Sequence, residues 1–259
     1  MEQEHGYSTA LMRRVPDAYA RFYRDRGISI SAELARRQHA AYAGALRAAG
    51  LEVHLLDADE AFPDCVFVED PAVVWSGRTL LARMAPHREG EQRGVADALA
   101  RWHEIVPLPA GAHLEGGDVL HVGDTTYVGL TTRTNAAGAA ALREFLSPAG
   151  RRVVEVPIAN YLHLKSAVTY LGNGALVAVP GCEGLDAFDV DEVVLADAAE
   201  PVAANSLRVG SHLLTPAGNP RTEARLRAFA GRHGVEVVPL DVSEFEKGEG
   251  SLTCLSIRW

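Results

Sequence analysis

The sequence predicts an α/β protein of five similar units arranged in a ring, a five-bladed α/β propeller. Strand-like apolar segments recur about every 50 residues, and a tight hairpin follows each of the first four. The segments 9–13 and 250–259, near the two ends, are left without strand partners and would close the ring by pairing.

Each unit contains an apolar segment that reads as a strand. These segments are 51–56, 104–108, 152–157, 192–195 and 235–240. A helical pattern precedes four of them, at 33–49, 92–102, 135–149 and 222–233. Three of these patterns stop at Gly50, Gly150 and Gly234, where glycine typically ends a helix. The stretch before 192 is too short for a comparable helix.

The hairpins decide between two ways of arranging these units. They join 72–75 to 79–81, 119–122 to 127–130, 168–171 to 175–177, and 206–209 to 212–214, each through a turn that contains glycine. A doubly wound sheet also alternates helices and strands, but four internal hairpins do not belong in a parallel sheet. The ring is therefore favoured, with residues 1–259 as a single catalytic domain.

Composition narrows the classes of function. A formal charge of −9 argues against nucleic-acid binding, and no apolar stretch is long enough to cross a membrane. The first residues are polar and do not read as a signal peptide. Cys65, Cys182 and Cys254 form neither a paired framework nor a metal-binding cluster, so we expect a cytoplasmic protein without metal or cofactor.

Polar residues lie at equivalent places in the five units, where they would face one axial channel. They are Asp64, Glu69 and Asp70, then Glu115 and Asp118, then His163 and Lys165, then Asn205, and finally Cys254. A thiol, an imidazole and several carboxylates at one point suggest a nucleophile, a proton shuttle and a site for a cation.

Five motifs carry a specific resemblance. They are Phe62-Pro63-Asp64-Cys65-Val66-Phe67-Val68-Glu69-Asp70-Pro71, Glu115-Gly116-Gly117-Asp118, Arg133-Thr134-Asn135, Leu162-His163-Leu164-Lys165 and Leu252-Thr253-Cys254-Leu255-Ser256. Together they resemble the signature of the dimethylarginine dimethylaminohydrolases, in the guanidino-modifying (pentein) superfamily of five-bladed propellers.

The resemblance implies hydrolysis of Nω-methylated L-arginine to L-citrulline and a methylamine through a covalent cysteine thiouronium intermediate. It makes Cys254 the nucleophile and His163 the group that protonates the leaving amine and then activates water. It gives Glu115 the role of orienting the histidine or binding a guanidinium nitrogen. The implied partner is a small guanidino substrate, no cofactor is implied, and homodimers are possible.

The resemblance also implies a substrate-binding set. Asp70 would clamp the guanidinium with Glu69 beside it, and Phe67 would cover the apolar stem. Asp64 would take the α-ammonium, and Arg88 and Arg133 the α-carboxylate. Gly248 stands at a site wall where the family often has a β-branched residue.

Two further regions carry weaker expectations. The segment 16–30 corresponds to a lid, but its sequence does not indicate which residue meets the substrate. Glu60, in the loop before the first motif, is expected to play no part in the site.

Other functions remain open, both enzymatic and non-enzymatic. A related hydrolase acting on arginine itself, or an amidinotransferase, would use a similar site on another guanidine. A ribosome-binding translation initiation factor shares the propeller, but it would not need Cys254, His163 and Glu115 together.

Overall fold

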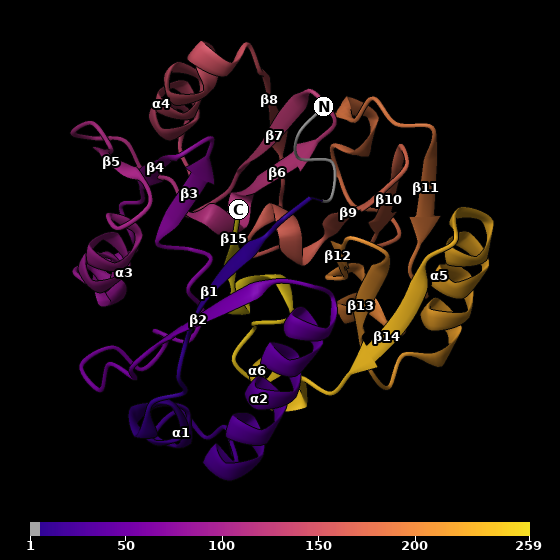
Figure 1. Cartoon of the computed structure of the whole chain (residues 1–259), viewed down its shortest axis with the longest axis horizontal. Coiled ribbons are helices and arrows are strands. Elements are labelled where there is room, and N and C mark those ends of the chain that lie inside the picture. The colour runs from indigo at the N-terminus through magenta and orange to yellow at the C-terminus, as the bar shows by residue number, and fades with distance from the viewer. Residues whose placement is uncertain (1–5) are drawn as a thin grey trace.

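The computed structural model describes residues 6–259 and consists of five three-stranded sheets around a central axis (Figure 1). The strand orders are β15-β1-β2, β3-β4-β5, β6-β7-β8, β11-β10-β9 and β12-β13-β14. The predicted five-bladed propeller is thereby confirmed.

The strands lie close to their predicted positions. They are β1 Thr9–Arg13, β2 Glu52–Leu56, β3 Ala72–Trp75, β4 Arg78–Leu81, β5 Glu104–Pro107, β6 Val119–Val122, β7 Thr125–Leu130, β8 Arg152–Pro157, β9 Val168–Gly172, β10 Ala175–Ala178, β11 Glu192–Leu195, β12 Leu207–Val209, β13 His212–Pro216, β14 Glu236–Leu240 and β15 Ile257–Arg258.

Each of the four blades that a continuous stretch of chain forms combines an antiparallel hairpin with one parallel outer strand. In the first hairpin β3 pairs antiparallel with β4, and β4 then pairs parallel with β5. The turn places Ser76 and Gly77 at positive φ, the conformation that a two-residue hairpin turn requires. Because two parallel strands need a crossover between them, the second strand of each hairpin connects to the outer strand by a longer segment. In three of these blades the crossover is a helix.

The two ends of the chain close the ring, as predicted. Strand β1 lies between β15 and β2, with Leu11 opposite Ile257 in the antiparallel pair and opposite His54 in the parallel pair. The C-terminal strand is shorter than predicted, because β15 contains only Ile257–Arg258. Cys254 lies before it, on the 3-10 turn Thr253–Leu255, and not at the start of a strand.

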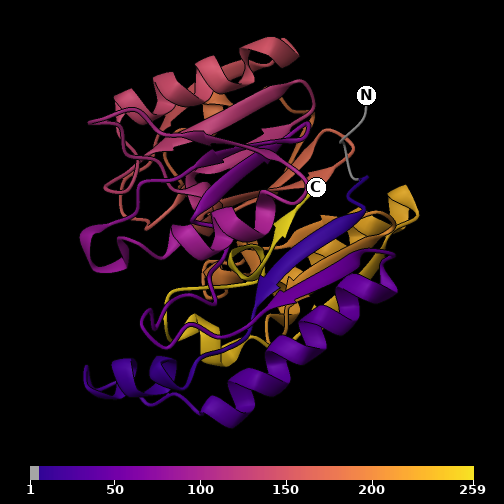
Figure 2. The same ribbon diagram turned by 60° about the vertical axis from the view of Figure 1, so that its left-hand side comes forward.

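Helices cover the outside of the ring (Figures 1 and 2). They are α2 Ala32–Ala48, α3 Gln92–Leu99, α4 Ala136–Leu146 and α5 Pro220–His233. Side chains cap two of them: Ser31 accepts a hydrogen bond from the backbone of Leu34, and Asn135 accepts one from Gly138. The fourth blade has only the short turn Leu185–Ala187 in place of a helix, in line with the prediction.

Two helices were not predicted, and they contact each other where the Tyr19 hydroxyl donates to the Glu244 carbonyl (3.2 Å). They are α1 Asp17–Arg24 and the single turn α6 Ser243–Glu246. The carboxylate of Glu60 accepts hydrogen bonds from the first backbone amides of α1, at Asp17 (2.7 Å) and Ala18 (2.8 Å). Glu60 therefore anchors the lid helix, and the expectation that it plays no part in the site stays a prediction.

Across residues 6–259, no helix combines the length and apolar character needed to cross a membrane.

Candidate active site

A cavity of about 400 Å³ lies between α1, the loop 247–250 and the turns that precede the inner strands of the blades. Nine of the ten site residues predicted from the sequence line it; Glu69 does not. The nine are Asp64, Phe67, Asp70, Arg88, Glu115, Arg133, His163, Gly248 and Cys254.

The propeller places Glu115, His163 and Cys254 at 3-10 turns that precede inner strands. Glu115 and His163 each immediately precede such a turn, Gly116–Asp118 and Leu164–Ser166, with extended backbones that direct both side chains to the same point. A Cβ atom on Gly117 would come within 2.6 Å of the His163 ring, so only glycine permits this approach.

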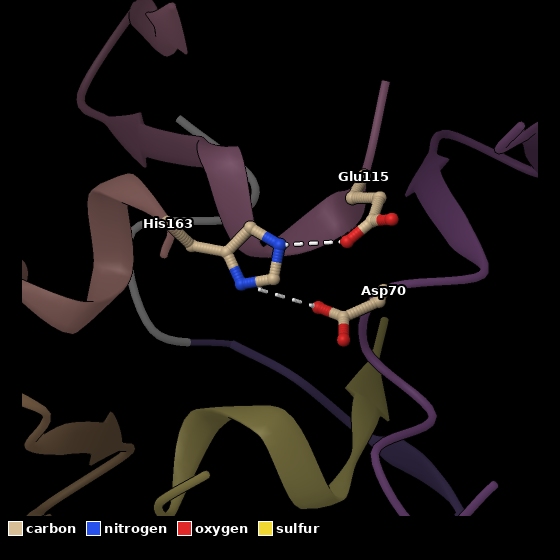
Figure 3. A group of neighbouring side chains, drawn as sticks. All are labelled: Asp70, Glu115 and His163. Atoms are coloured by element: carbon tan, nitrogen blue, oxygen red, sulfur yellow. Dashed lines mark hydrogen bonds and ion pairs between the residues drawn. The ribbon is translucent and has the colours of Figure 1, made fainter. Parts of the chain in front are cut away.

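His163 lies between two carboxylates (Figure 3). Its Nε2 is 2.8 Å from Glu115 Oε2, and its Nδ1 is 3.8 Å from Asp70 Oδ1. Burial alone would lower the pKa of His163, but the charges of Asp70, Glu115 and Asp118 raise it to about 9. At neutral pH the imidazole is protonated and ready to donate a proton.

The same three side chains form the only group of this kind, among the described residues, whose geometry could hold a metal ion. Their ligand atoms all lie within 4.8 Å of one another. A metal would have to displace the proton of His163, whose pKa of about 9 works against this at neutral pH.

Cys254 is held by its neighbours on the 3-10 turn. The side-chain amide of Asn205 accepts from the Thr253 backbone (2.9 Å) and donates to its hydroxyl (3.0 Å), and the Glu69 backbone donates to the Cys254 carbonyl (3.1 Å). Burial, with the charges of Glu69 and Asp70, raises the pKa of the Cys254 thiol to about 12. Without a cation beside it, the sulfur is therefore a neutral thiol.

Asp118 does not line the cavity but holds two of the segments that form it. It accepts hydrogen bonds from the Leu164 backbone (2.9 Å) and from the hydroxyls of Thr131 (2.7 Å) and Thr134 (2.6 Å). These bonds fix the turn after His163 and the loop that carries Arg133.

The two arginines of the site differ. Arg88 is buried and donates to Asp70 (2.6 Å), to both oxygens of Glu91 (2.9 and 2.6 Å) and to two backbone carbonyls. Its donors are therefore largely committed within the protein, which disagrees with the expected role in binding an α-carboxylate. Arg133 keeps 22% of its side chain exposed and has one ion pair, to Glu115 at 3.7 Å.

Glu69 does not stand beside Asp70 at the guanidinium position. Its carboxylate pairs with Lys165 (2.6 Å) and Arg258 (3.1 Å), and all three residues line a separate cavity of about 110 Å³. The expectation of two neighbouring carboxylates clamping one cation is thus corrected: adjacent side chains point into different cavities.

The lid meets the site through Tyr23, which the sequence did not single out. Its hydroxyl lies 3.0 Å from Asp64 Oδ1 and 3.2 Å from the Gly248 carbonyl. A Cβ atom on Gly248 would come within 2.6 Å of the Tyr19 hydroxyl and 2.9 Å of Tyr23. Glycine at 248 is therefore what allows the lid to pack, and no local pattern could have linked positions 225 residues apart.

Phe67 also packs closely against the loop 247–250, at Gly250. A Cβ atom on Gly250 would lie 2.1 Å from its ring, so the loop 247–250 runs directly against the aromatic face.

Glu91 was also missed. It stands three residues after Arg88 and pairs with it inside the protein, and this spacing was the available signal.

Comparison with known proteins identifies the family. The model of the family described as "N,N dimethylarginine dimethylhydrolase, eukaryotic" matches residues 12–181. Dimethylarginine dimethylaminohydrolases from Streptomyces coelicolor and Pseudomonas aeruginosa are 43% and 33% identical over 87% of this chain, covering 86% and 88% of those proteins.

Solved structures of dimethylarginine dimethylaminohydrolases have the same fold as this chain. A cysteine-to-serine variant of the Pseudomonas aeruginosa enzyme complexed with citrulline superposes with a TM-score of 0.87 at 29% identity, covering 98% of this chain and 99% of that one. A histidine-to-glycine variant of a dimethylarginine dimethylaminohydrolase, as an adduct with S-methyl-L-thiocitrulline, gives 0.88 at 30% identity, covering 98% and 100%. On this evidence the chain belongs to the dimethylarginine dimethylaminohydrolase family.

Proposed function

We propose that this chain is a hydrolase that converts Nω-methylated L-arginine to L-citrulline and a methylamine. The observation that carries the proposal is one cavity in which a thiol, a protonated imidazole and a buried carboxylate meet. Relatives that are 43% and 33% identical are dimethylarginine dimethylaminohydrolases, which supports the same reaction.

The guanidinium would bind at Asp70. Its Oδ2 is already held by Arg88, but its Oδ1 is buried and has no hydrogen-bond partner among residues 6–259. A buried acceptor without a donor is costly, and a guanidinium N–H supplies a charge-assisted bond. Phe67 would lie along the apolar stem of the substrate.

The amino-acid end of the substrate would bind nearer the lid. Asp64 would take the α-ammonium, with Tyr23 beside it, and Arg133 would take the α-carboxylate. Arg88 would contribute its positive charge more than new hydrogen bonds, because its donors are already committed.

The first chemical step forms a bond between Cys254 Sγ and the guanidinium carbon. The bound cation lowers the pKa of the thiol, so that the thiol loses its proton to solvent and the thiolate forms only when substrate is present. The bond from this carbon to the methylated nitrogen then breaks. His163 gives its proton to that nitrogen, and a neutral amine leaves behind a positively charged thiouronium.

The second step hydrolyses the thiouronium. His163, now neutral and held by Glu115, takes a proton from water, and the oxygen attacks the same carbon. The carbon–sulfur bond breaks, the hydroxyl proton of the adduct passes to the sulfur, and neutral citrulline and the neutral Cys254 thiol form while His163 is left protonated. Glu115 acts throughout as the group that orients the imidazole.

We extend the proposal to the cellular compartment and the oligomeric state. The three cysteines are free thiols, which supports a reducing compartment such as the cytoplasm. A homodimer stays a prediction drawn from the family resemblance.

The test is to incubate the purified protein with arginine, monomethylarginine and asymmetric dimethylarginine. Citrulline and released amine should appear in equal amounts from the methylated substrates. Release of ammonia from arginine at a higher kcat/KM would instead favour an arginine deiminase-like hydrolase. Transfer of the amidine to an added amine, without citrulline, would favour an amidinotransferase.

A further inference from the structure

A second cavity, of about 180 Å³, adjoins the nucleophile. It lies between the loop 246–251 and the turns that precede β9 and β12, and it is lined by Ser166, Val202, Asn205, Glu246, Glu249, Gly250, Ser251 and Cys254. We call it the side cavity. Cys254 lines both the side cavity and the substrate cavity, so the two meet at the reacting sulfur.

The two cavities differ in charge. The side cavity is lined by the carboxylates of Glu246 and Glu249 and by no lysine, arginine or histidine of the described chain. The substrate cavity carries both signs of charge. Its cationic side chains are Arg26, Arg88, Arg133, His163 and Lys247, and its carboxylates are Asp64, Asp70, Glu115 and Glu249, the last of which lines both cavities. A small cation released at Cys254 therefore meets negative charge alone in the side cavity and charges of both signs in the substrate cavity.

Glu246 has the character of a carboxylate that lacks a counter-ion. Burial, with the nearby charge of Asp241, raises its pKa, and no positive group compensates. Glu249 is exposed at the rim, and its positive φ of 61° holds the loop in a conformation that few residues adopt.

Ser251 adds an independent sign of a ligand. The residue is 5% exposed and lines the side cavity, yet its hydroxyl has no hydrogen-bond partner within residues 6–259. Buried hydroxyls are normally paired, so this group is available to a ligand in the side cavity.

The proposed reaction supplies a ligand of the right kind. The amine that leaves the guanidinium carbon is separated from Cys254 Sγ by that one atom. A dialkylamine is strongly basic, as the lysine pKa of about 10.4 illustrates, so it takes a proton from water and becomes a cation at neutral pH. The remaining amino-acid part of the substrate still fills the substrate cavity at that moment.

We propose that the side cavity is a binding site and exit for the small alkylammonium product, separate from the path of citrulline. The inference rests on the proposed hydrolysis and adds a subsite to it. Glu246 and Glu249 attract the cation, Ser251 can accept one of its N–H groups, and Val202 contacts its methyl groups.

Binding of dimethylammonium itself tests this without turnover. Broadening of its methyl proton resonance, titrated with protein, gives a Kd with and without saturating citrulline. The two Kd values should agree within about threefold, because separate sites do not compete. Displacement of dimethylammonium by citrulline would overturn the proposal.

Charge variants test the location. Glu246→Gln keeps the shape of the side chain and should weaken dimethylammonium binding about 5- to 20-fold, since a charge-assisted contact is lost. Asp97→Asn, on the exposed face of α3, removes the same charge far from the cavity and is the matched control. Equal Kd values for the two variants would contradict the assignment.

Failure of this inference and failure of the proposed function are distinguishable. Citrulline formation from dimethylarginine by the wild-type protein tests the function alone. If citrulline forms, dimethylammonium should inhibit without competing with dimethylarginine; purely competitive inhibition would reject the side cavity and leave the function standing. If no citrulline forms, the binding experiments still decide whether the cavity takes an alkylammonium ion.

Discussion

At the scale of single residues, the site depends on which charges are compensated. His163 has three carboxylates around it and is protonated, whereas Cys254 lies near Asp70 and Glu69 and keeps its proton. The resting site therefore holds an imidazolium and a thiol, and the missing cation is the one that the substrate brings.

This charge balance predicts the pH dependence of thiol alkylation. Because burial and two carboxylates raise the pKa of Cys254 to about 12, its reaction with iodoacetamide should be slow at pH 7 and should still be rising at pH values above about 9. A bound, unreactive guanidinium compound should shift this profile to lower pH. Mass spectrometry of the Cys254 peptide measures the rate, and a plateau reached below pH 8 would contradict the raised pKa.

The carboxylate of Asp70 is predicted to contribute strongly to transition-state binding. Asp70→Asn keeps the shape but removes the charge that faces both the substrate and Arg88. We expect kcat/KM to fall about 30- to 1,000-fold, equivalent to roughly 2–4 kcal/mol.

Glu89→Gln, an exposed neighbour of Arg88, is the appropriate control for that experiment, because Glu60 anchors the lid helix. Steady-state kinetics with dimethylarginine provide the comparison. An Asp70→Asn value of kcat/KM within about twofold of wild type would mean that the guanidinium binds elsewhere.

At the scale of elements, the lid and the wall loop form one unit. Tyr19 and Tyr23 of α1 fill the space that a side chain at Gly248 would occupy. Gly248→Val should push the lid outward, raise KM for dimethylarginine about 5- to 50-fold, and change kcat less.

A double variant separates lid packing from damage to the fold. Adding Tyr23→Ala to Gly248→Val removes one of the two side chains that the valine would meet, Tyr19 being the other, and should recover part of the lost affinity. If KM for Gly248→Val is unchanged, or if the double variant is simply worse, the lid does not depend on this contact.

The elements themselves were largely predictable. Hairpins such as 72–81 and helices such as α2 are specified by local periodicity, glycine turns and caps, which adjacent residues carry. The lid helix α1 was missed because its N-terminus is capped by Glu60, more than 40 residues away, and not by a local residue.

The candidate site was predictable only in part, for a physical reason. The repeat places Asp70, Glu115, His163 and Cys254 at equivalent ring positions, so their convergence follows from topology. The direction of each side chain does not follow from topology. Glu69, for example, points to Lys165 and not to the substrate. The commitment of Arg88 to Glu91 likewise depends on burial that the sequence does not reveal.

At the scale of the whole molecule, charges behind the site connect the end of the chain to the ring. Arg258 of β15 donates to Glu69, which also pairs with Lys165 on the turn that precedes β9. All three side chains are about nine-tenths buried or more. This cluster links the closing strand to the centre of the propeller.

Removing the central charge of the cluster should destabilise the fold. Glu69→Gln leaves two buried cations without a counter-charge, and we expect a loss of about 3–5 kcal/mol of unfolding free energy. Chemical denaturation measures this loss, with Glu183→Gln on an exposed loop as control. A variant as stable as wild type would show that the cluster does not hold the ring closed.

The most direct test of the central claim is to trap the covalent intermediate. His163→Gly removes the group that activates water, so a substrate with a good leaving group, such as S-methyl-L-thiocitrulline, should accumulate as a thiouronium adduct on the protein. Mass spectrometry of the digested protein should place the adduct on the peptide that contains Cys254, and Cys254→Ser in the same background should abolish it. An adduct on Cys65 or Cys182, or turnover by His163→Gly at the wild-type rate, would contradict the proposed mechanism.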